Sequence, residues 1–180
     1  MNRMYWFAAA PALLLAACND KNTIEAKNAS PEEVQKKLAQ SDARPQPGRW
    51  QQTVKIEAFD MPNMPPEGKA AMAEQMGKTH TAFTCMTPEQ VAKPDASFFQ
   101  KTAKGCKYDH FTMSGGRIDA KMTCAEGPQK QVSTLNGTYS ATQYDMVINV
   151  DTEMAPGMPV KSRLALKMNR VGECTGKDES

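Results

Sequence analysis

Apolar and polar residues alternate with a period of two in several segments of this chain, and this period restricts the fold to one built on β-sheet. The segment from Trp50 to Ala58 alternates in this way, and so does the segment from Val160 to Met168. Because successive side chains of a strand point to opposite faces of a sheet, each segment has one face to bury. We therefore expect antiparallel strands with one buried face and one solvated face.

A pair of glycines fixes the register of one predicted hairpin. Gly115-Gly116 is a natural two-residue turn within residues 106–124. Around this turn Phe111 lies opposite Ala120, and both belong to the apolar face. A shift of one residue would place Phe111 opposite Asp119 and divide the apolar face. The register with the two-residue turn is therefore favoured. It determines to which face of the sheet each residue of the hairpin points.

A second hairpin is predicted around residues 140–143. Asn136-Gly137 is the stronger local turn signal, but a turn there separates Tyr139 from its apolar partners. A turn at 140–143 instead places Tyr139 opposite Tyr144 on the apolar face. We place the turn at 140–143.

Short helices are predicted by capping patterns and by glycine. Residues 30–33 begin one helix that ends near Gln40, residues 67–77 form a second, and residues 87–90 begin a third of one or two turns. The expected fold is mainly β: an antiparallel meander forming a curved sheet or open barrel, with one or two short inserted helices and an N-terminal tether.

The N-terminus predicts export and a lipid anchor. Residues 1–17 contain one cation, a short apolar run and small residues at the exit, which is the pattern of a signal peptide. The Leu-Ala-Ala sequence directly before Cys18 matches a bacterial lipobox, so we expect Cys18 to carry the lipid. Asn19 is similar to the residue at this position in lipoproteins that are sorted to the outer membrane. We therefore expect a periplasm-facing protein anchored to the outer membrane, with the inner membrane as the alternative.

Three parts are predicted after the signal peptide. Residues 18–47 are read as a lipidated N-terminus and polar tether with a short helix, residues 48–174 as the β-rich domain, and residues 175–180 as a polar tail. The tether carries only a thin apolar stripe, which predicts a spacer that holds the domain away from the membrane.

Four cysteines remain in the domain after Cys18 is assigned to the lipid: Cys85, Cys106, Cys124 and Cys174. An even number in an exported protein predicts two disulfides. The hairpin register sends Cys106 and Cys124 to opposite faces, so we expect Cys85–Cys106 and Cys124–Cys174, with Cys85–Cys124 and Cys106–Cys174 as the rival pairing. The chain has no C-x-x-C pair, so a zinc site is not expected.

Several motifs give the chain a resemblance to a known family. They are PGRW at 47–50, MPNMPP at 61–66, CMTPEQVAKPDASFF at 85–99, FTMSGGRIDAKMTC at 111–124, GTYSATQYDMVINV at 137–150 and RVGEC at 170–174. Over about residues 47–174 the chain resembles the bacterial envelope family known as domain of unknown function 3617. The resemblance implies an exported or lipid-anchored protein of Gram-negative bacteria. It implies no activity, cofactor or substrate, because none is established for the family.

Five aromatic residues are candidates for lining a ligand-binding hollow in the curved sheet: Trp50, Phe83, Phe111, Tyr139 and Tyr144. A curved antiparallel sheet can hold an apolar ligand in its concavity. The same rings could instead fill the concavity, which would leave a structural or protein-contacting lipoprotein.

Methionine suggests the other candidate site. Met61, Met64, Met72 and Met76 are close in sequence and offer thioethers, which favour Cu(I). The alternative is that Met72 and Met76 pack their helix onto the sheet, while Met113, Met122, Met146 and Met168 fill the core.

The chain carries no motif of nucleophilic, metalloprotease or phosphate-binding chemistry. His110 follows Asp109, but adjacent strand residues point to opposite faces, so His110 is expected at the surface. With 22 basic and 20 acidic residues, the charge is too balanced for binding driven by nucleic-acid phosphates. We expect a non-enzymatic binding or envelope-maintenance protein with no cofactor. Its partners would be the membrane, through the anchor, and a small apolar ligand or an envelope protein.

Overall fold

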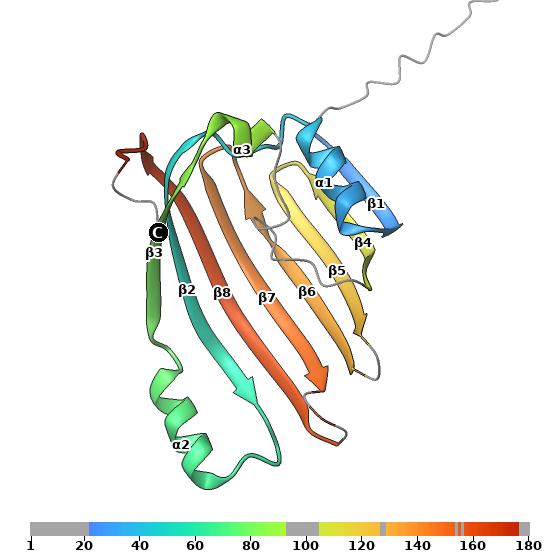
Figure 1. Cartoon of the computed structure of the whole chain (residues 1–180), viewed down its shortest axis with the longest axis vertical. Helices are drawn as coiled ribbons and strands as arrows, with labels where there is room; N and C mark the ends of the chain where they lie inside the picture. The colour runs from blue at the N-terminus through green and yellow to red at the C-terminus, as the bar shows by residue number, and fades with distance from the viewer. Residues whose placement is uncertain (1–21, 93–104, 127–128, 154, 156, 177–180) are drawn as a thin grey trace, which may run out of the picture.

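The structure, a computed structural model, describes residues 22–92, 105–126, 129–153, 155 and 157–176. Within them eight strands form one antiparallel sheet in the order β1-β4-β5-β6-β7-β8-β2-β3. The strands are β1 Ile24–Ala29, β2 Gly48–Asp60, β3 Thr79–Met86, β4 Cys106–Ser114, β5 Arg117–Glu126, β6 Gln129–Tyr139, β7 Gln143–Glu153 and β8 Pro159–Gly172. The helices are α1 Pro31–Ala39, α2 Pro66–Gln75 and α3 Pro88–Ala92 (Figure 1).

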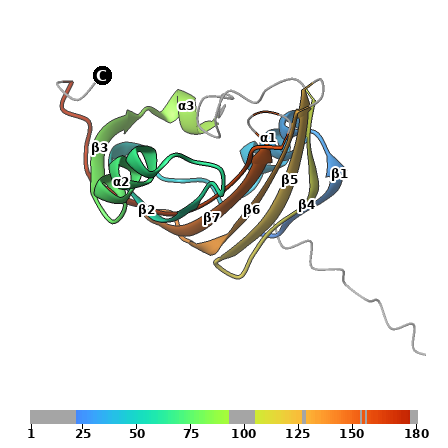
Figure 2. The same cartoon turned by 90° about the horizontal axis from the view of Figure 1, so that it is seen from below.

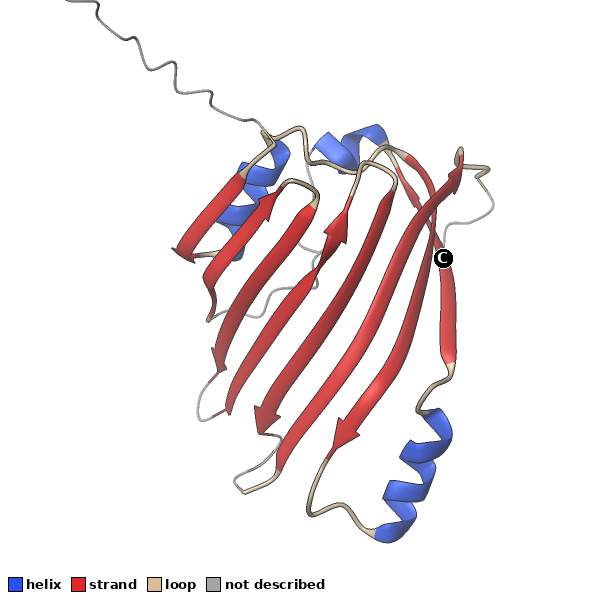
Figure 3. Ribbon diagram, turned by 180° about the vertical axis from the view of Figure 1, so that it is seen from behind, coloured by secondary structure: helices blue, strands red, loops and turns tan. Residues whose placement is uncertain are grey.

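The sheet curves into an open trough. Viewed along the strands, it bends from β3 round to β1, and α1 and α3 lie on its concave side (Figure 2). Its two edge strands, β1 and β3, pair only with β4 and β2, so the sheet is not closed (Figure 3). The predicted mainly β fold with a curved, open sheet is confirmed, and the core lies on the concave face.

The predicted register of the first hairpin is confirmed from the turn as far as His110, and that of the second hairpin is confirmed along its length. Phe111 pairs with Ala120 around the two-glycine turn. Tyr139 pairs with Tyr144 around the turn at 140–143, so the Asn136-Gly137 signal is overruled as expected. The helix starts at residues 30 and 87 are confirmed too, because capping boxes form at Ser30 and at Thr87.

The predicted disulfides are wrong. The structure joins Cys106 to Cys124 and Cys85 to Cys174, with Cα–Cα distances of 3.9 and 5.5 Å. The prediction assumed an unbroken strand from the turn to Cys106, but the register shifts between Tyr108 and His110. This bulge adds one residue to β4, turns Cys106 to the face of Cys124 and sets the two opposite each other.

The second bridge differs from its prediction because β8 ends before its cysteine. The strand ends at Gly172, so Cys174 no longer follows the face of Met168. At this end of the sheet Arg49 of β2 pairs with both Cys85 and Gly172. The C-terminal residues therefore pass close to β3, and Cys174 reaches Cys85.

The prediction of a polar tether is wrong for residues 24–43. β1 adds a strand beside β4, and α1 packs against the concave face. Ile24, Val34 and Leu38 are 3%, 3% and 2% exposed and belong to the main core. A thin apolar stripe was sufficient because β1 needs only one buried face and α1 covers the end of a trough that is already apolar.

The PGRW and RVGEC motifs meet where β2 and β8 pair. Arg170 Nε donates to the Pro47 carbonyl at 2.7 Å, and Trp50 is fully buried next to this junction. Gly48 has φ +138°, and a Cβ there would lie 2.5 Å from the Gly172 carbonyl oxygen. Only glycine fits this close approach. These motif residues therefore stabilise the pairing of β2 with β8.

Candidate functional site

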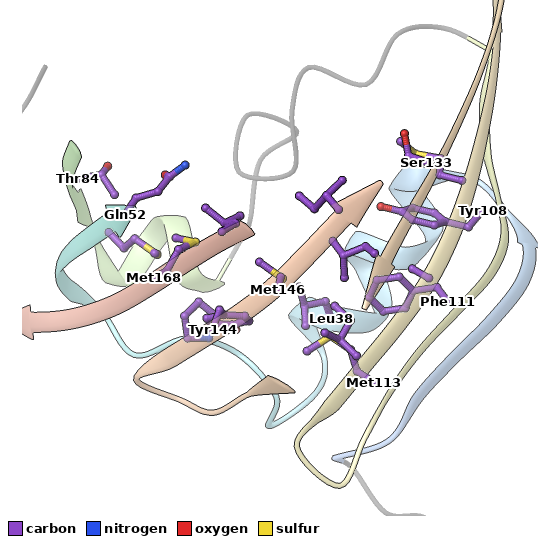
Figure 4. Close-up of a pocket in the computed structure, with 18 of the residues that line it drawn as sticks. Leu38, Gln52, Thr84, Tyr108, Phe111, Met113, Ser133, Tyr144, Met146 and Met168 are labelled. Atoms are coloured by element: carbon purple, nitrogen blue, oxygen red, sulfur yellow. The ribbon is translucent and has the colours of Figure 1, made fainter. Parts of the chain in front are cut away.

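The concave face contains a cavity of about 510 Å³. Its lining comes from α1, α3 and most strands of the sheet (Figure 4). The lining residues are Leu38, Pro45, Gln52, Thr84, Cys85, Met86, Gln90, Val91, Tyr108, Phe111, Met113, Ile118, Ala120, Met122, Gln131, Ser133, Leu135, Tyr144, Met146, Ile148, Val150, Leu166 and Met168. The volume falls within the range of about 300–1,000 Å³ that is typical of small-molecule sites.

Sheet register explains why these side chains converge. Phe111, Ala120, Leu135 and Ile148 lie in one cross-strand row from β4 to β7. A second row, formed by Met113, Ile118, Met146 and Leu166, runs beside it. Gly137 stands between Ile118 and Met146 in that second row and contributes no side chain to it. The concave face of the sheet is therefore apolar across most of its width.

Only some of the predicted aromatic residues line the cavity. Phe111 and Tyr144 do so. Trp50 is fully buried beside them, with its ring 5.9 Å from that of Tyr144 and its indole N–H donating to the Gln46 carbonyl at 2.9 Å. Tyr139 is partly buried against the core, and its hydroxyl donates to the Asn22 carbonyl.

The prediction for Phe83 is wrong. The residue pairs with Gln51 on the face opposite Trp50, is 38% exposed and lies under the Arg49 guanidinium at 4.1 Å. From the same strand, Thr84 and Met86 on the other face line the cavity instead. Alternation along β3 does not by itself tell which face is buried, so it could not exclude Phe83.

Sequence reasoning missed Tyr108. Counted from the Gly115-Gly116 turn, it would face the convex side, but the bulge turns it to the concave face. Its ring meets Phe111 edge to face at 5.3 Å. Burial raises the pKa of the Tyr108 hydroxyl. No hydrogen-bond partner of this hydroxyl occurs among residues 22–92, 105–126, 129–153 and 157–176. No sequence signal marks the bulge.

The methionines predicted to face the core do face it. Met113, Met146 and Met168 are buried and Met122 is half-buried. All four line the cavity, together with Met86. Leu38 and Val91, which come from helices, also line it and were missed because the search for a hollow considered only aromatic residues.

The candidate copper site gains no support from burial. α2 has no buried residue, Met72 is half-buried and Met76 is 36% exposed, so the helix does not pack onto the sheet as the alternative required. Met64 lies next to Gly68 at the start of α2. In the part of the chain that is described, no three His, Cys, Asp or Glu side chains gather as a metal site.

His110 lies at the surface, as predicted. It pairs with Asp119 at 2.5 Å, while Asp109 pairs with Lys121 at 3.3 Å. Because of the bulge, Asp109 and His110 both contact side chains of β5, and neither lines the cavity. Residue 18, the predicted lipidation site, lies outside the described residues. No helix among those that are described is long and apolar enough to cross a membrane.

Comparison with known proteins places the chain in a family. Residues 45–174 match the family model described as "Protein of unknown function (DUF3617)". No curated protein and no solved structure matches. The match begins after β1 and α1, so Leu38 comes from outside it, whereas the other lining residues lie within it. Since the match covers well over half of the chain, the protein belongs to this family, the proteins of unknown function DUF3617.

Proposed function

We propose that this protein is a non-enzymatic, lipid-anchored protein of the bacterial cell envelope that holds an apolar small molecule in the hollow of its sheet. The anchor would be Cys18, and the domain would face the periplasm from the outer membrane. The family assignment carries no activity, so the proposal depends on the cavity and on the N-terminal sequence.

One observation carries the binding role: the concave face keeps an apolar cavity of about 510 Å³. Protein interiors are normally packed to the density of organic crystals, so a domain of this size would be expected to fill its concavity. Here α1 and α3 cover the trough without filling it. A cavity walled by apolar side chains with a few polar groups is the usual form of a small-molecule site.

The uncharged dye Nile red, which fluoresces in apolar surroundings, tests the binding role on the full chain with Cys18→Ser, recovered from the periplasm. We expect saturable binding. Ser133→Phe places a ring in the cavity and should abolish it. Thr134→Phe is the matched control, because Thr134 is the next residue of the same strand, points to the other face and contacts Asn149.

Circular dichroism and the thermal midpoint establish that both variants fold. If Ser133→Phe does not fold, Gln131→Phe, at another lining residue of the same strand, takes its place. The absence of dye binding by the folded chain, or equal binding by all variants, overturns the binding role and leaves a protein-contacting module.

Cell fractionation tests the anchor separately. Cys18→Ser should move the protein from the membrane fraction to the soluble periplasmic fraction, because the thioether lipid can no longer form. A protein that stays in the membrane fraction contradicts the lipobox interpretation.

A further inference from the structure

Polar side chains lie at both ends of the cavity. Figure 4 shows Gln52 and Thr84 at one end, Tyr108 and Ser133 at the other, and Met146 and Leu38 between them. The pairing of strands agrees, because Gln52 lies beside Met168 in β8 while Tyr108 and Ser133 both flank Met122. A ligand that fills this cavity must therefore have a long apolar middle part.

The described residues that line the cavity include no charged residue. Among these 23 side chains there is no Asp, Glu, Lys, Arg or His. Basic side chains of the same strands form ion pairs away from the cavity, as with Lys121 to Asp109 and Lys167 to Asp145. An ionised group placed in the cavity would lose its water without gaining a counterion, which is strongly unfavourable. The cavity therefore disfavours a fatty-acid anion.

Tyr108 provides a hydrogen-bond donor at one end. Its hydroxyl points into the cavity in Figure 4, and its ring is held edge to face against Phe111. Within the described part of the chain nothing accepts a hydrogen bond from it. Tyr108 is partly buried, and its hydroxyl faces an apolar cavity, so a ligand that brings an acceptor to this position gains a hydrogen bond. A tyrosine hydroxyl is protonated at neutral pH even at its ordinary pKa near 10, so it is a donor there, and burial raises the pKa of Tyr108 further.

We propose that the ligand is an acyl compound with an uncharged, hydrogen-bond-accepting head, that is, a fatty-acid ester or amide, and that Tyr108 donates to its carbonyl oxygen. This inference rests on the proposed function. It assigns the acyl chain to the apolar middle of the cavity, around Leu38 and Met146. It assigns the ester or amide group to the Tyr108 end.

Competition against Nile red tests the ligand class. Laurate and its glycerol ester carry the same acyl chain, and at pH 7 only laurate is ionised. We expect the ester to displace the dye at a concentration at least about tenfold lower, because the anion has no counterion in the cavity. Dye binding together with equal displacement, or with better displacement by laurate, overturns this inference and leaves the binding role in place. If no dye binds, the binding role fails as well.

Tyr108→Phe tests the donor. Loss of one hydrogen bond should raise the dissociation constant of the ester by about three- to tenfold, leave that of laurate unchanged and so reduce the ratio between them. Tyr139→Phe is the control, because the Tyr139 hydroxyl donates to the Asn22 carbonyl outside the cavity. A role of Tyr108 in packing alone would move both ligands together. If the ratio of the dissociation constants of laurate and its ester is the same in Tyr108→Phe as in Tyr139→Phe, the assignment of Tyr108 as the donor is contradicted.

Discussion

Tyr108 and Phe111 lie on the same face of β4, with ring centroids 5.3 Å apart, although they are three positions apart in the chain. In a regular strand, residues three apart point to opposite faces. The bulge at Asp109 removes this conflict. It brings a hydroxyl into the cavity and brings Cys106 opposite Cys124, so one extra residue determines both the site and a disulfide.

Two deletions test the bulge. Deletion of Asp109 should cost less than about 1.5 kcal/mol of unfolding free energy, because Tyr108 and His110 already pair with consecutive residues of β5. Deletion of Thr112 keeps Cys106 opposite Cys124 but turns Phe111 outward and His110 inward. Since it exposes a buried ring, it should cost at least about 3 kcal/mol. Denaturant unfolding measures both, and equal costs would be inconsistent with a bulge at this position.

The two disulfides should stabilise the protein unequally. Cys85–Cys174 spans 89 residues and Cys106–Cys124 spans 18. The loss of chain entropy in the unfolded state predicts a stabilisation of about 4.6 kcal/mol from the longer loop and about 3.2 kcal/mol from the shorter one. Replacing each pair by serine and measuring urea unfolding should therefore show the greater loss for Cys85→Ser/Cys174→Ser. Peptide mapping without reductant that links Cys85 to Cys106 would refute the pairing itself.

Gly48→Ala should destabilise the protein by at least about 2 kcal/mol, because it adds backbone strain and a close contact with the Gly172 carbonyl oxygen. Gly157→Ala is the control. Gly157 also has a positive φ, +79°, but nothing lies within 4 Å of its added Cβ, so about 1 kcal/mol is expected there. Thermal unfolding compares the two, and a cost at Gly48 no larger than at Gly157 would exclude the close contact.

Alkaline pH should destabilise the fold through two tyrosines. Burial raises the pKa of both Tyr108 and Tyr144, and the neighbouring Tyr139 adds to the effect on Tyr144. The unfolded chain releases these protons near pH 10, whereas the folded protein retains them. Their contribution is therefore complete below about pH 10 and is lost as the pH rises further. Urea unfolding between pH 8 and 11 measures this effect. The free energy of unfolding should fall less steeply with pH in Tyr108→Phe/Tyr144→Phe than in wild type. An identical dependence on pH would argue against the burial effect.

Most of the fold could be predicted from local sequence, and the exceptions have physical causes. The turn at 140–143 followed from pairing Tyr139 with Tyr144, because one buried face fixes the register. The bulge at Asp109 could not be predicted, because one extra residue in a strand changes neither composition nor turn signals. β1 and α1 looked like a spacer because short elements at the end of a trough need few apolar residues, such as Ile24 and Leu38.

The site was predicted less well than the fold. Phe111 and Tyr144 were found because they belong to paired apolar rows. Tyr108 was missed because it faces the cavity only through the bulge, which was not predicted. That the concavity stays open rather than filled depends on how α1 and α3 lie over the sheet, which period-two patterns do not report.

Native mass spectrometry of the protein purified from its own cell envelope tests the central claim most directly. The full chain with Cys18→Ser, released from the periplasm without detergent, should retain an uncharged apolar molecule at one per chain, and Ser133→Phe should remove it while Thr134→Phe keeps it. A bare mass for the folded chain, or a retained mass that Ser133→Phe does not displace, would contradict a ligand-binding cavity on the concave face.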